Sequence, residues 1–479
     1  MSDELMELPK GWFTARLGDC LRLINGRAYL RHELLEKGTP IIRIQNLNGG
    51  NNWFYSDLQL PEDKYCDRGD LLFAWSATFG PFIWQGSHSI YHYHIWKVEP
   101  FEVINQKFAY HLFQEITQEV KAAAHGVAMP HMTKQGMESW QIPLPPLNEQ
   151  KRIVAAIEAL RERSQKARSV LSVIPELCDK FRQSVLAAAF RGDLTADWRE
   201  QNPDVKAALE ILSELQSTKR KQKNKTNTIS SSFDIPFEAP ETWEWIILDI
   251  ICEKITDGEH LTPPLAEKGV PLLSAKDVRD WSLDFSNTKF VSSEVAEKSR
   301  ARCNPEKNDV LVVSRGATVG RTSRVKTEEP FCLMGSVLLF KLNQSIIEPE
   351  FIELFFKSPF GARQLTSMSG ASAQQAIYIR DMRSFPTPFP PLTEQKEIVR
   401  QVKTLFQFID KIEESHEGTE AYLDRLNQSI LAKAFRGELV DQDPNDEPAS
   451  VLLKRIRVDR EQRAQEKTKR KRTVKTDSV

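Results

Sequence analysis

The feature that most constrains this chain is an internal repeat whose two copies keep a constant separation over part of their length. Residues 144–150 read Leu-Pro-Pro-Leu-Asn-Glu-Gln, and residues 389–395, at an offset of 245, read Phe-Pro-Pro-Leu-Thr-Glu-Gln. Residues 189–194 (Ala-Phe-Arg-Gly-Asp-Leu) recur at the same offset as residues 434–439 (Ala-Phe-Arg-Gly-Glu-Leu). The two segments bounded by these motifs contain no net insertion relative to each other, which predicts a duplicated architecture.

The rest of each half repeats more loosely. Pro9 matches Pro240 at an offset of 231, and the offset climbs to 245 by the start of the fixed segments. Each half is therefore predicted to hold a variable globular part, within residues 10–143 and 241–388, followed by a part of fixed length.

Short apolar or alternating runs indicate strands in each globular part. The predicted strands are 41–44, 71–75, 91–98, 272–275, 310–314 and 337–341, and the predicted helices are 106–123 and 349–366. Turn signals such as Asn25-Gly26 and Asp257-Gly258 separate these runs. The pattern predicts an α+β domain of about 130 to 150 residues, present twice.

Each fixed segment carries apolar residues at alternating spacings of four and three. The principal positions of this seam are Ile153, Ile157, Leu160, Ile174 and Phe181 in the first segment and Ile398, Val402, Leu405, Ile409, Leu423 and Leu426 in the second. Such spacing keeps two helices in contact along their length. Long helices from the two halves packed on each other are the preferred arrangement, and a helical hairpin inside each domain is the alternative.

Both seams are interrupted at a similar depth. Pro175 falls in the first seam and Gly418 in the second, so each region is predicted to be one kinked helix or two stacked helices. At about 1.5 Å per residue, the helical stretch from Ile153 to Val185 is roughly 48 Å long.

Charge and hydropathy narrow the classes of function. The 479 residues carry 65 Lys and Arg against 66 Asp and Glu, so bulk charge excludes a protein that coats nucleic acid, and any polyanion must meet local basic patches. Basic runs at 219–225 and 454–475 are expected to be solvated segments, with contact to phosphate or to an acidic partner as the alternative. No membrane span and no secretory signal are visible, and the six widely spaced cysteines predict reduced thiols in the cytoplasm.

Motifs for catalysis and metal binding are missing from the sequence. It contains no Gly-x-Gly-x-x-Gly, no Walker A sequence, no His-Glu-x-x-His, no Asn-Pro-Pro-aromatic run and no paired cysteines of a zinc site. We therefore expect no catalytic residues, no metal and no cofactor on this chain. The rival interpretations are a stand-alone DNA-modifying enzyme with an unfamiliar site and a structural coiled-coil adaptor.

Polar side chains gather at the predicted strand ends of both halves. Arg, Lys, Gln and Asn can make paired hydrogen bonds to base edges in the major groove. An ordinary exposed loop explains any single residue better, so the prediction depends on equivalent loops being polar in both halves. The candidates for DNA binding are Arg27, Tyr29, Arg43, Gln45, Asn46, Ser76, Thr78, His131 and Lys134 in the first half and His260, Thr262, Lys276, Arg279, Arg315, Thr318, Arg321, Gln374, Gln375, Tyr378 and Arg380 in the second.

The duplicated motifs, alternating with two variable domains, resemble the specificity subunits of type I restriction–modification systems. The resemblance covers essentially the whole chain and includes Gly69-Asp70-Leu71-Leu72 and Asp257-Gly258-x-His260. It implies two tandem target-recognition domains, separated by long helical regions that pack as an antiparallel coiled coil with a pseudo-twofold internal duplication. The implied boundaries are 1–143 and 231–388 for the recognition domains, 144–230 and 389–453 for the helical regions, and 454–479 for a basic tail.

The resemblance also implies the partners. Each recognition domain is expected to read one half of a bipartite, asymmetric site on double-stranded DNA, and the helical regions are expected to set the spacing and dock two modification subunits. S-adenosylmethionine is then expected on the modification subunits, and ATP and Mg on the restriction subunits. Half-sites read from one face of B-DNA lie roughly 34–36 Å apart, a separation that a stiff rod of two helices can impose.

Overall fold

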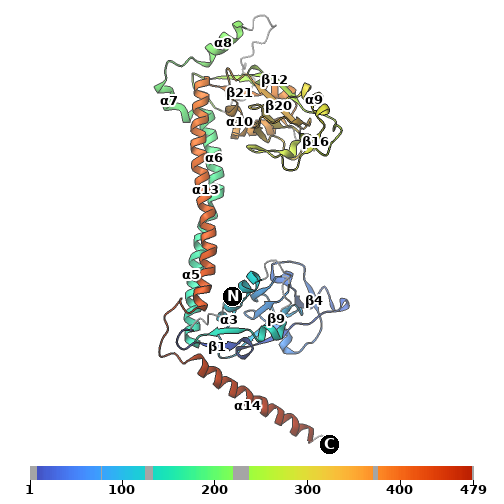
Figure 1. Ribbon diagram of the computed structural model, residues 1–479, viewed down its shortest axis with the longest axis vertical. Helices are drawn as coiled ribbons and strands as arrows, with labels where there is room; N and C mark the ends of the chain where they lie inside the picture. The colour runs from blue at the N-terminus through green and yellow to red at the C-terminus, as the bar shows by residue number, and fades with distance from the viewer. Residues whose placement is uncertain (1–7, 77, 124–132, 219–236, 370–375, 477–479) are drawn as a thin grey trace. The chain divides into compact units, whose positions relative to one another are not determined.

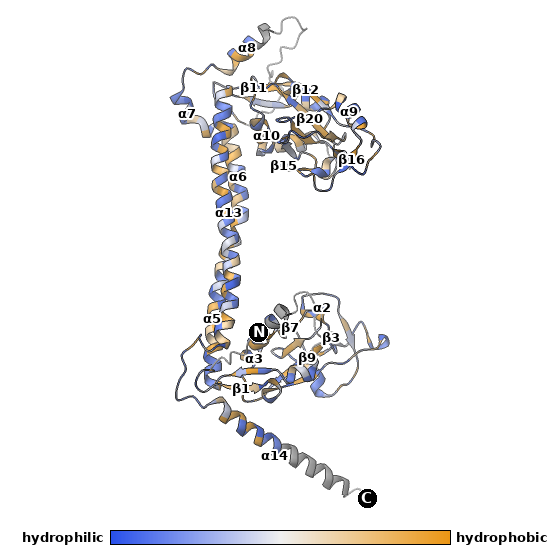
Figure 2. Ribbon diagram, viewed as in Figure 1, coloured by the Kyte–Doolittle hydropathy of each residue, from blue (hydrophilic) through white to orange (hydrophobic). Residues whose placement is uncertain are grey.

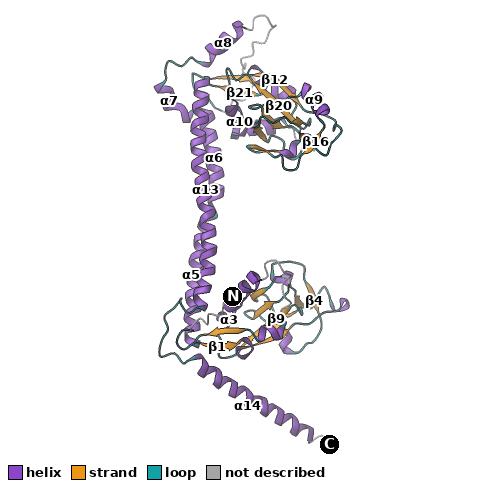
Figure 3. Ribbon diagram, in the orientation of Figure 1, coloured by secondary structure: helices purple, strands orange, loops and turns teal. Residues whose placement is uncertain are grey.

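The computed structural model describes residues 8–76, 78–123, 133–218, 237–369 and 376–476 (Figure 1). The chain divides into two units: unit 1 comprises Met1–Leu171 and Gly418–Val479, and unit 2 comprises Ser172–Glu417. Each unit contains one globular domain and parts of the helical regions. Figure 3 shows strands confined to the globular domains, and helices joined by loops in the helical regions.

The described residues of domain 1, in unit 1, form sixteen elements. In chain order they are β1 (Phe13–Arg16), α1 (Leu17–Cys20), β2 (Leu21–Asn25), η1 (Arg31–Glu33), β3 (Thr39–Ile42), α2 (Ile44–Leu47), β4 (Phe54–Ser56), η2 (Glu62–Lys64), β5 (Tyr65–Cys66), β6 (Leu71–Ala74), β7 (Gly80–Ile83), β8 (Ser89–Tyr91), β9 (Ile95–Pro100), α3 (Gln106–Ala123), α4 (Lys134–Glu138) and β10 (Gln141–Leu144). They form one sheet with the order β2-β9-β6-β7, a second with the order β4-β3-β8-β5, and the pair β1-β10.

Domain 2, in unit 2, repeats this plan with additions. Its elements are β11 (Glu244–Ile247), η4 (Leu248–Ile250), β12 (Cys252–Asp257), β13 (Val270–Leu273), η5 (Ala275–Asp277), β14 (Val278–Arg279), β15 (Ser282–Leu283), β16 (Lys289–Val291), α9 (Ser293–Arg302), β17 (Val310–Val313), β18 (Thr322–Arg324), β19 (Cys332–Leu333), β20 (Val337–Leu342), α10 (Pro349–Lys357), α11 (Pro359–Met368), α12 (Ile379–Arg383) and β21 (Pro386–Phe389). The sheets are β12-β20-β17-β18, β16-β13-β19 and the pairs β14-β15 and β11-β21.

The central strands are continuously apolar because both of their faces are buried. In β17, Val310 and Val312 face one core cluster, whereas Leu311 and Val313 face another. Figure 2 shows the same concentration of hydrophobic residues around β20. The duplication extends to strand direction, because β3 pairs in parallel with β8 and β13 pairs in parallel with β19, and β3 and β13 each have an antiparallel partner on the other side.

Two predicted elements are each split in the structure. The predicted helix 349–366 is two helices, because Ser358 and Pro359 end α10 and start α11, and Ser358 Oγ accepts a hydrogen bond from the Gly361 amide. The predicted strand 91–98 is a turn at residues 92–94 followed by β9. The predicted helix 106–123 coincides with α3.

The helical regions consist of α5 (Leu147–Leu171), α6 (Ile174–Arg191), η3 (Asp193–Thr195), α7 (Ala196–Gln201), α8 (Ala208–Thr218), α13 (Leu392–Phe435) and α14 (Ala449–Thr476). The first region is interrupted before Pro175, as predicted. The second is one continuous helix through Gly418, so the alternative of two stacked helices is wrong there; a single glycine weakens a helix by only about 1 kcal/mol and does not end it.

Helices from the two halves pack on each other within each unit, and they run antiparallel. In unit 2, Arg182 of α6 pairs with Glu413 of α13 at 2.6 Å, while Thr195, farther along, donates to Glu394, nearer the start of α13. In unit 1, α5 and the end of α13 show the same reversal, because Arg168 pairs with Glu420 whereas the earlier Glu149 lies by Gln442. Figure 1 shows α5 lying beside α13 and α6 lying beside α13. The helical hairpin within each domain is therefore wrong.

Most predicted seam positions are buried between these helices. Ile153, Ile157, Ile398, Val402 and Ile409 are fully buried, Leu423 is 8 % exposed, and Leu160, Ile174, Leu405 and Leu426 are partly buried. Phe181 is the correction: its side chain is 42 % exposed. Cys178 and Val185, which lie in the same seam, are buried, and the neighbouring Arg182 faces α13 in place of Phe181 and pairs with Glu413 at 2.6 Å.

The end of each helical region docks on a turn at the start of a globular domain. In unit 1 the Ala449 amide, at the start of α14, donates to Gly11 O at 3.0 Å; in unit 2 the Ala208 amide, at the start of α8, donates to Thr242 O at 3.0 Å. The basic tail is helical as far as Thr476. Figure 2 shows hydrophobic and hydrophilic residues alternating along the coloured part of α14.

Candidate nucleic-acid interface

Four loops of domain 1 meet at one edge of its sheets. The Tyr93 amide donates to Arg27 O at 3.0 Å, and the Trp75 amide donates to His94 O at 3.1 Å. The side chain of Asn48 donates to Thr78 Oγ1 at 3.0 Å. Gly26 allows this close approach, since a Cβ there would lie 2.2 Å from His92 O.

Domain 2 holds the equivalent loops together by equivalent bonds. The Gly335 amide donates to Glu259 O at 2.7 Å, and the Ser314 amide donates to Ser336 O at 2.8 Å. Gly258 takes the place of Gly26, because a Cβ on it would lie 2.0 Å from Leu333 O. A further isolated β-bridge, without a counterpart in the described residues of domain 1, joins Arg315 to Ala376.

The first candidates of domain 1 are engaged within the loops. Arg27 pairs with both carboxylate oxygens of Glu33, at 2.6 and 3.1 Å, and this hydrogen bonding raises the pKa of Arg27 and lowers that of Glu33. The guanidinium of Arg27 also lies 5.4 Å from the ring of Tyr29, whose pKa is raised by burial. Arg27, Glu33 and Tyr29 therefore contact one another and stabilise the loop.

The second loop of domain 1 includes one correction. Asn46 is 7 % exposed, its Oδ1 accepts from the Arg43 amide and its Nδ2 donates to Gly50 O and Asn52 O, so its polar atoms are used to close the loop. Arg43 lies over the ring of Phe54 at 4.2 Å. Gln45 is exposed and donates to Asn52 O.

The remaining candidates of domain 1 are scattered. Ser76 is half-buried and Thr78 exposed on the loop after β6. Lys134 lies in the first turn of α4, 3.5 Å from Glu138, and no hydrogen bond or ion pair within the described residues connects it to the four loops. His131 lies outside the described residues.

In domain 2 several candidates are also paired. His260 lies 3.4 Å from Asp257, which forms a 2.7 Å ion pair with Arg302, and Thr262 beside it is exposed. Lys276 donates to Asn287 O at 2.8 Å, and Arg279 pairs with Asp284 at 3.3 Å.

The loop after β17 differs from these. The guanidinium groups of Arg315 and Arg321 have no ion-pair partner among the described residues; Arg315 is exposed and Arg321 half-buried, as is Thr318 between them. Tyr378 is 54 % exposed, two residues after the segment that pairs with Arg315, and Arg380 pairs with its neighbour Asp381. Gln374 and Gln375 lie outside the described residues.

Sequence reasoning missed an aromatic group in domain 1. Trp75, His92, Tyr93 and His94 meet beside the loop that begins at Arg27, with Tyr93 and His94 rings 3.9 Å apart and Trp75 and His94 rings 5.1 Å apart. Burial lowers the pKa of His92 to about 4 and also lowers that of His94, so both imidazoles are neutral at pH 7. The available signal was the match of His92-Tyr93-His94 to Met334-Gly335-Ser336 at a constant offset, with Gly335 marking a turn.

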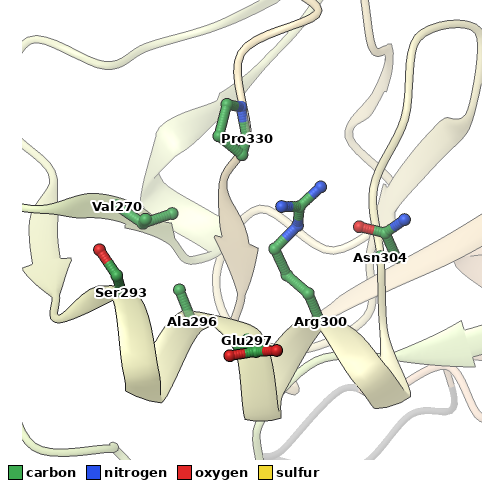
Figure 4. A pocket seen from close by; sticks show the side chains of 7 residues that line it. All are labelled: Val270, Ser293, Ala296, Glu297, Arg300, Asn304 and Pro330. Atoms are coloured by element: carbon green, nitrogen blue, oxygen red, sulfur yellow. The ribbon is translucent and has the colours of Figure 1, made fainter.

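A cavity of about 430 Å³ in domain 2 lies beside α9, at the start of β13, whereas the loops described above follow the end of β13. Figure 4 shows the Arg300 guanidinium between Pro330 and Asn304, with Glu297 on the same helix. Among the described residues, no group of three or more His, Cys, Asp or Glu side chains is placed to hold a metal ion. All six cysteines are free thiols, as predicted.

No helix in the described part of the chain is long and apolar enough to cross a membrane.

The fold and site together define a recognition protein with two similar domains. The domains hold equivalent loops by equivalent backbone bonds, but the loops carry different side chains. A family model described as the type I restriction modification DNA specificity domain matches residues 9–169 and 240–420. The chain belongs to this family of type I specificity subunits.

Similar proteins extend over nearly the whole chain. The specificity subunit of the type I restriction enzyme EcoBI from Escherichia coli is 27 % identical over 98 % of this chain and 96 % of the relative. The EcoKI specificity subunit from Escherichia coli K12 is 25 % identical over 98 % and 99 %. A crystal structure of the HsdS subunit from Thermoanaerobacter tengcongensis has the same fold, with a TM-score of 0.55 and 22 % identity over 91 % of this chain and 100 % of that one. The predicted fold class is thereby confirmed.

Proposed function

We propose that this chain is the DNA-specificity subunit of a type I restriction–modification complex and that each domain reads one half of a bipartite, asymmetric site. One observation carries the proposal: the two domains hold matching loops by matching backbone bonds, while the side chains differ. Tyr93 and Gly335 donate to the corresponding carbonyls of Arg27 and Glu259, yet the loops share almost no side chain. A common frame with different side chains suits two readers of two different sequences.

Domain 2 has the clearest means of reading bases. Arg315 and Arg321 carry guanidinium groups without carboxylate partners among the described residues. An arginine in this state can donate two parallel hydrogen bonds to O6 and N7 of guanine in the major groove. Domain 2 is therefore proposed to read a half-site that contains guanine.

The helical regions are proposed to set the spacing of the half-sites and to dock two modification subunits. Their constant length between the duplicated motifs and their antiparallel packing in each unit support this role. The chain is proposed to be non-catalytic and to act in the cytoplasm, where its DNA is. Adenine methylation with S-adenosylmethionine then belongs to the modification subunits, and ATP- and Mg-dependent cleavage to the restriction subunits.

Exchanging residues 10–143 for the corresponding domain of another such protein tests the proposal. Methylated adenines mapped in the genome of a host that carries the complex should show one half of the site changed and the other half retained. Loss of both halves together contradicts independent readers.

The rival functions predict other results. Turnover of DNA by the purified chain without partners, either cleavage or methyl transfer, favours the stand-alone enzyme. Binding to DNA without any sequence preference, in the complete complex, favours the structural adaptor.

A further inference from the structure

An exposed aromatic group stands among the loops of domain 1. The turn between β8 and β9 places the ring of Tyr93 at the surface, 40 % exposed, with His92 and His94 at ring distances of 4.5 and 3.9 Å. Trp75 lies beside them, and its indole Nε1 donates to Tyr93 O at 2.9 Å. We name Trp75, His92, Tyr93 and His94 the aromatic cluster.

The aromatic cluster is anchored rigidly to the core. Trp75 stacks on Trp96 with ring centroids 6.0 Å apart, and Trp96 stacks on Phe73 at 5.8 Å. Trp96 is 2 % exposed and Phe73 is fully buried. A surface ring that is already held in place loses little conformational entropy when a ligand covers it.

The fold itself does not require these rings. Domain 2 forms the same turn with the same backbone bonds, but Met334, Gly335 and Ser336 occupy the positions of His92, Tyr93 and His94. Ser314 replaces Trp75, since both residues donate their amides to the third residue of that turn. Because the frame forms without aromatic side chains in domain 2, their presence in domain 1 is better explained by what domain 1 binds.

The chemistry of the aromatic cluster selects the kind of contact. It contains no Lys or Arg, and burial lowers the pKa values of its imidazoles, so they are neutral at pH 7. Of the two arginines nearby, Arg27 is paired with Glu33, and Arg43 lies over the ring of Phe54 and donates to Asn52 O. Such a surface has little attraction for phosphate, which is held by cations and by backbone N–H groups. It suits an apolar group on a base edge, and in the major groove that group is the C5-methyl of thymine.

We propose that the aromatic cluster determines the specificity of domain 1 by receiving the methyl group of a thymine in its half-site, with Tyr93 as the contacting ring. The inference rests on the proposed function, since it presumes that domain 1 reads DNA. It gives domain 1 a mode of reading that differs from the arginine-based mode of domain 2.

The test uses the complete complex and duplexes carrying the site that it selects from random sequences. Each thymine of the half-site assigned to domain 1 is replaced by uracil, which lacks only the methyl group. At one position uracil should lower the affinity of the wild-type complex about three- to tenfold, the scale of one buried methyl group. Tyr93→Ala should bind the thymine and uracil duplexes equally, while Tyr93→Phe should keep the difference.

Phe13→Ala is the matched control, because it removes a ring with the same 40 % exposure as Tyr93 from β1 of the same domain, outside the four loops, and should leave the uracil effect intact. A uracil scan without effect in a complex that binds its two-part site overturns the inference and leaves the proposed function standing. So does a Tyr93→Ala complex that keeps the full uracil effect. Selection of no two-part site at all overturns the proposed function itself.

Discussion

Gly437, which follows the last turn of α13, packs on Pro9 at the start of domain 1, so that a Cβ on Gly437 would lie 2.3 Å from Pro9 Cγ. In unit 2, Gly192 packs in the same way on Pro240, with a corresponding distance of 2.4 Å. The second helical region thus ends on the first domain, and the first helical region ends on the second domain. Each globular domain therefore contacts the helical region that belongs to the other half of the sequence, and each of these contacts lies within one unit.

Replacing Gly437 by alanine should destabilise unit 1. Its φ of +74° costs an L-residue about 1–2 kcal/mol, and the contact with Pro9 adds a clash, so a total loss of about 2–3 kcal/mol is expected. Gly69→Ala is the control, because Gly69 has a φ of +98° with open space around its Cβ and should show the backbone term alone. Hydrogen exchange of β6 and β9 amides measures both; equal losses in the two variants would contradict the steric contribution.

The buried side-chain amides of Gln150 and Gln395 should contribute equally and additively to the free energy of unfolding. Gln150 accepts from the Asn105 amide and donates to Val103 O and Pro145 O, and Gln395 makes the same three bonds in unit 2. Leucine at either position leaves three buried backbone groups unpaired, a loss of about 2–4 kcal/mol.

The double variant should lose the sum, within about 0.5 kcal/mol, because the two networks share no partner. Urea denaturation of the single and double variants gives the values. Strong coupling between them would show that the units do not unfold independently.

Arg315 should be needed for base discrimination in one half-site only. Arg315→Ala is expected to cost about 1–3 kcal/mol of binding to the cognate site and to relax the preference for guanine at one position. Arg315→Lys keeps the charge and the salt dependence but lacks the paired donors, so the preference should still be lost. Competition assays with guanine replaced at each position measure this preference for guanine. A changed preference in the other half-site would count against separate readers.

The stability of unit 1 should fall as the pH falls from about 6.5 to about 4. His111 is 4 % exposed, bonded to Gln114 and next to Arg161, and burial lowers its pKa to about 4. The unfolded chain binds this proton near pH 6.5 and the folded chain does not, so acid favours unfolding by up to about 3 kcal/mol.

His111→Gln removes the titrating group and keeps a polar side chain. Relative to the wild type, its stability should depend less on pH between 6.5 and 4, as measured by urea unfolding at several pH values. Parallel curves for the two proteins would contradict a neutral His111.

A matched lengthening of both helical regions should lengthen the spacer between the half-sites. Seven residues inserted after Ser164 and seven after Leu426 keep the seam in phase and add about 10 Å of helix, on the order of three base pairs at most. The single insertion after Ser164 breaks the antiparallel match and should abolish methylation. Mapping of methylated adenines shows the spacer, and an unchanged spacer in the double insertion would refute the proposed ruler.

Local patterns in the chain were sufficient for much of the fold. The helix at 106–123, the apolar strands β6 and β17 and the break before Pro175 follow from side-chain periodicity and from the chemistry of proline, which act over a few residues. The glycines at 26 and 258 were recognisable as turn residues for the same reason. Phe181 is the exception, because the adjacent Arg182 pairs with Asp410 and Glu413 of α13 and occupies the place that the spacing gives to an apolar side chain.

What the sequence alone determined was the duplication, the two seams and the family of the protein, because repeats, spacing and motifs are properties of the order of residues. Tertiary structure decided which polar side chains are free to meet a partner. Arg27 pairs with Glu33 and Asn46 donates to Gly50 O, so both are bonded within their own loops, whereas Arg315 has no such partner among the described residues. Trp75 contacts His94 only because separate strands pair. Such pairings depend on register and packing across segments distant in the chain, which no local pattern specifies.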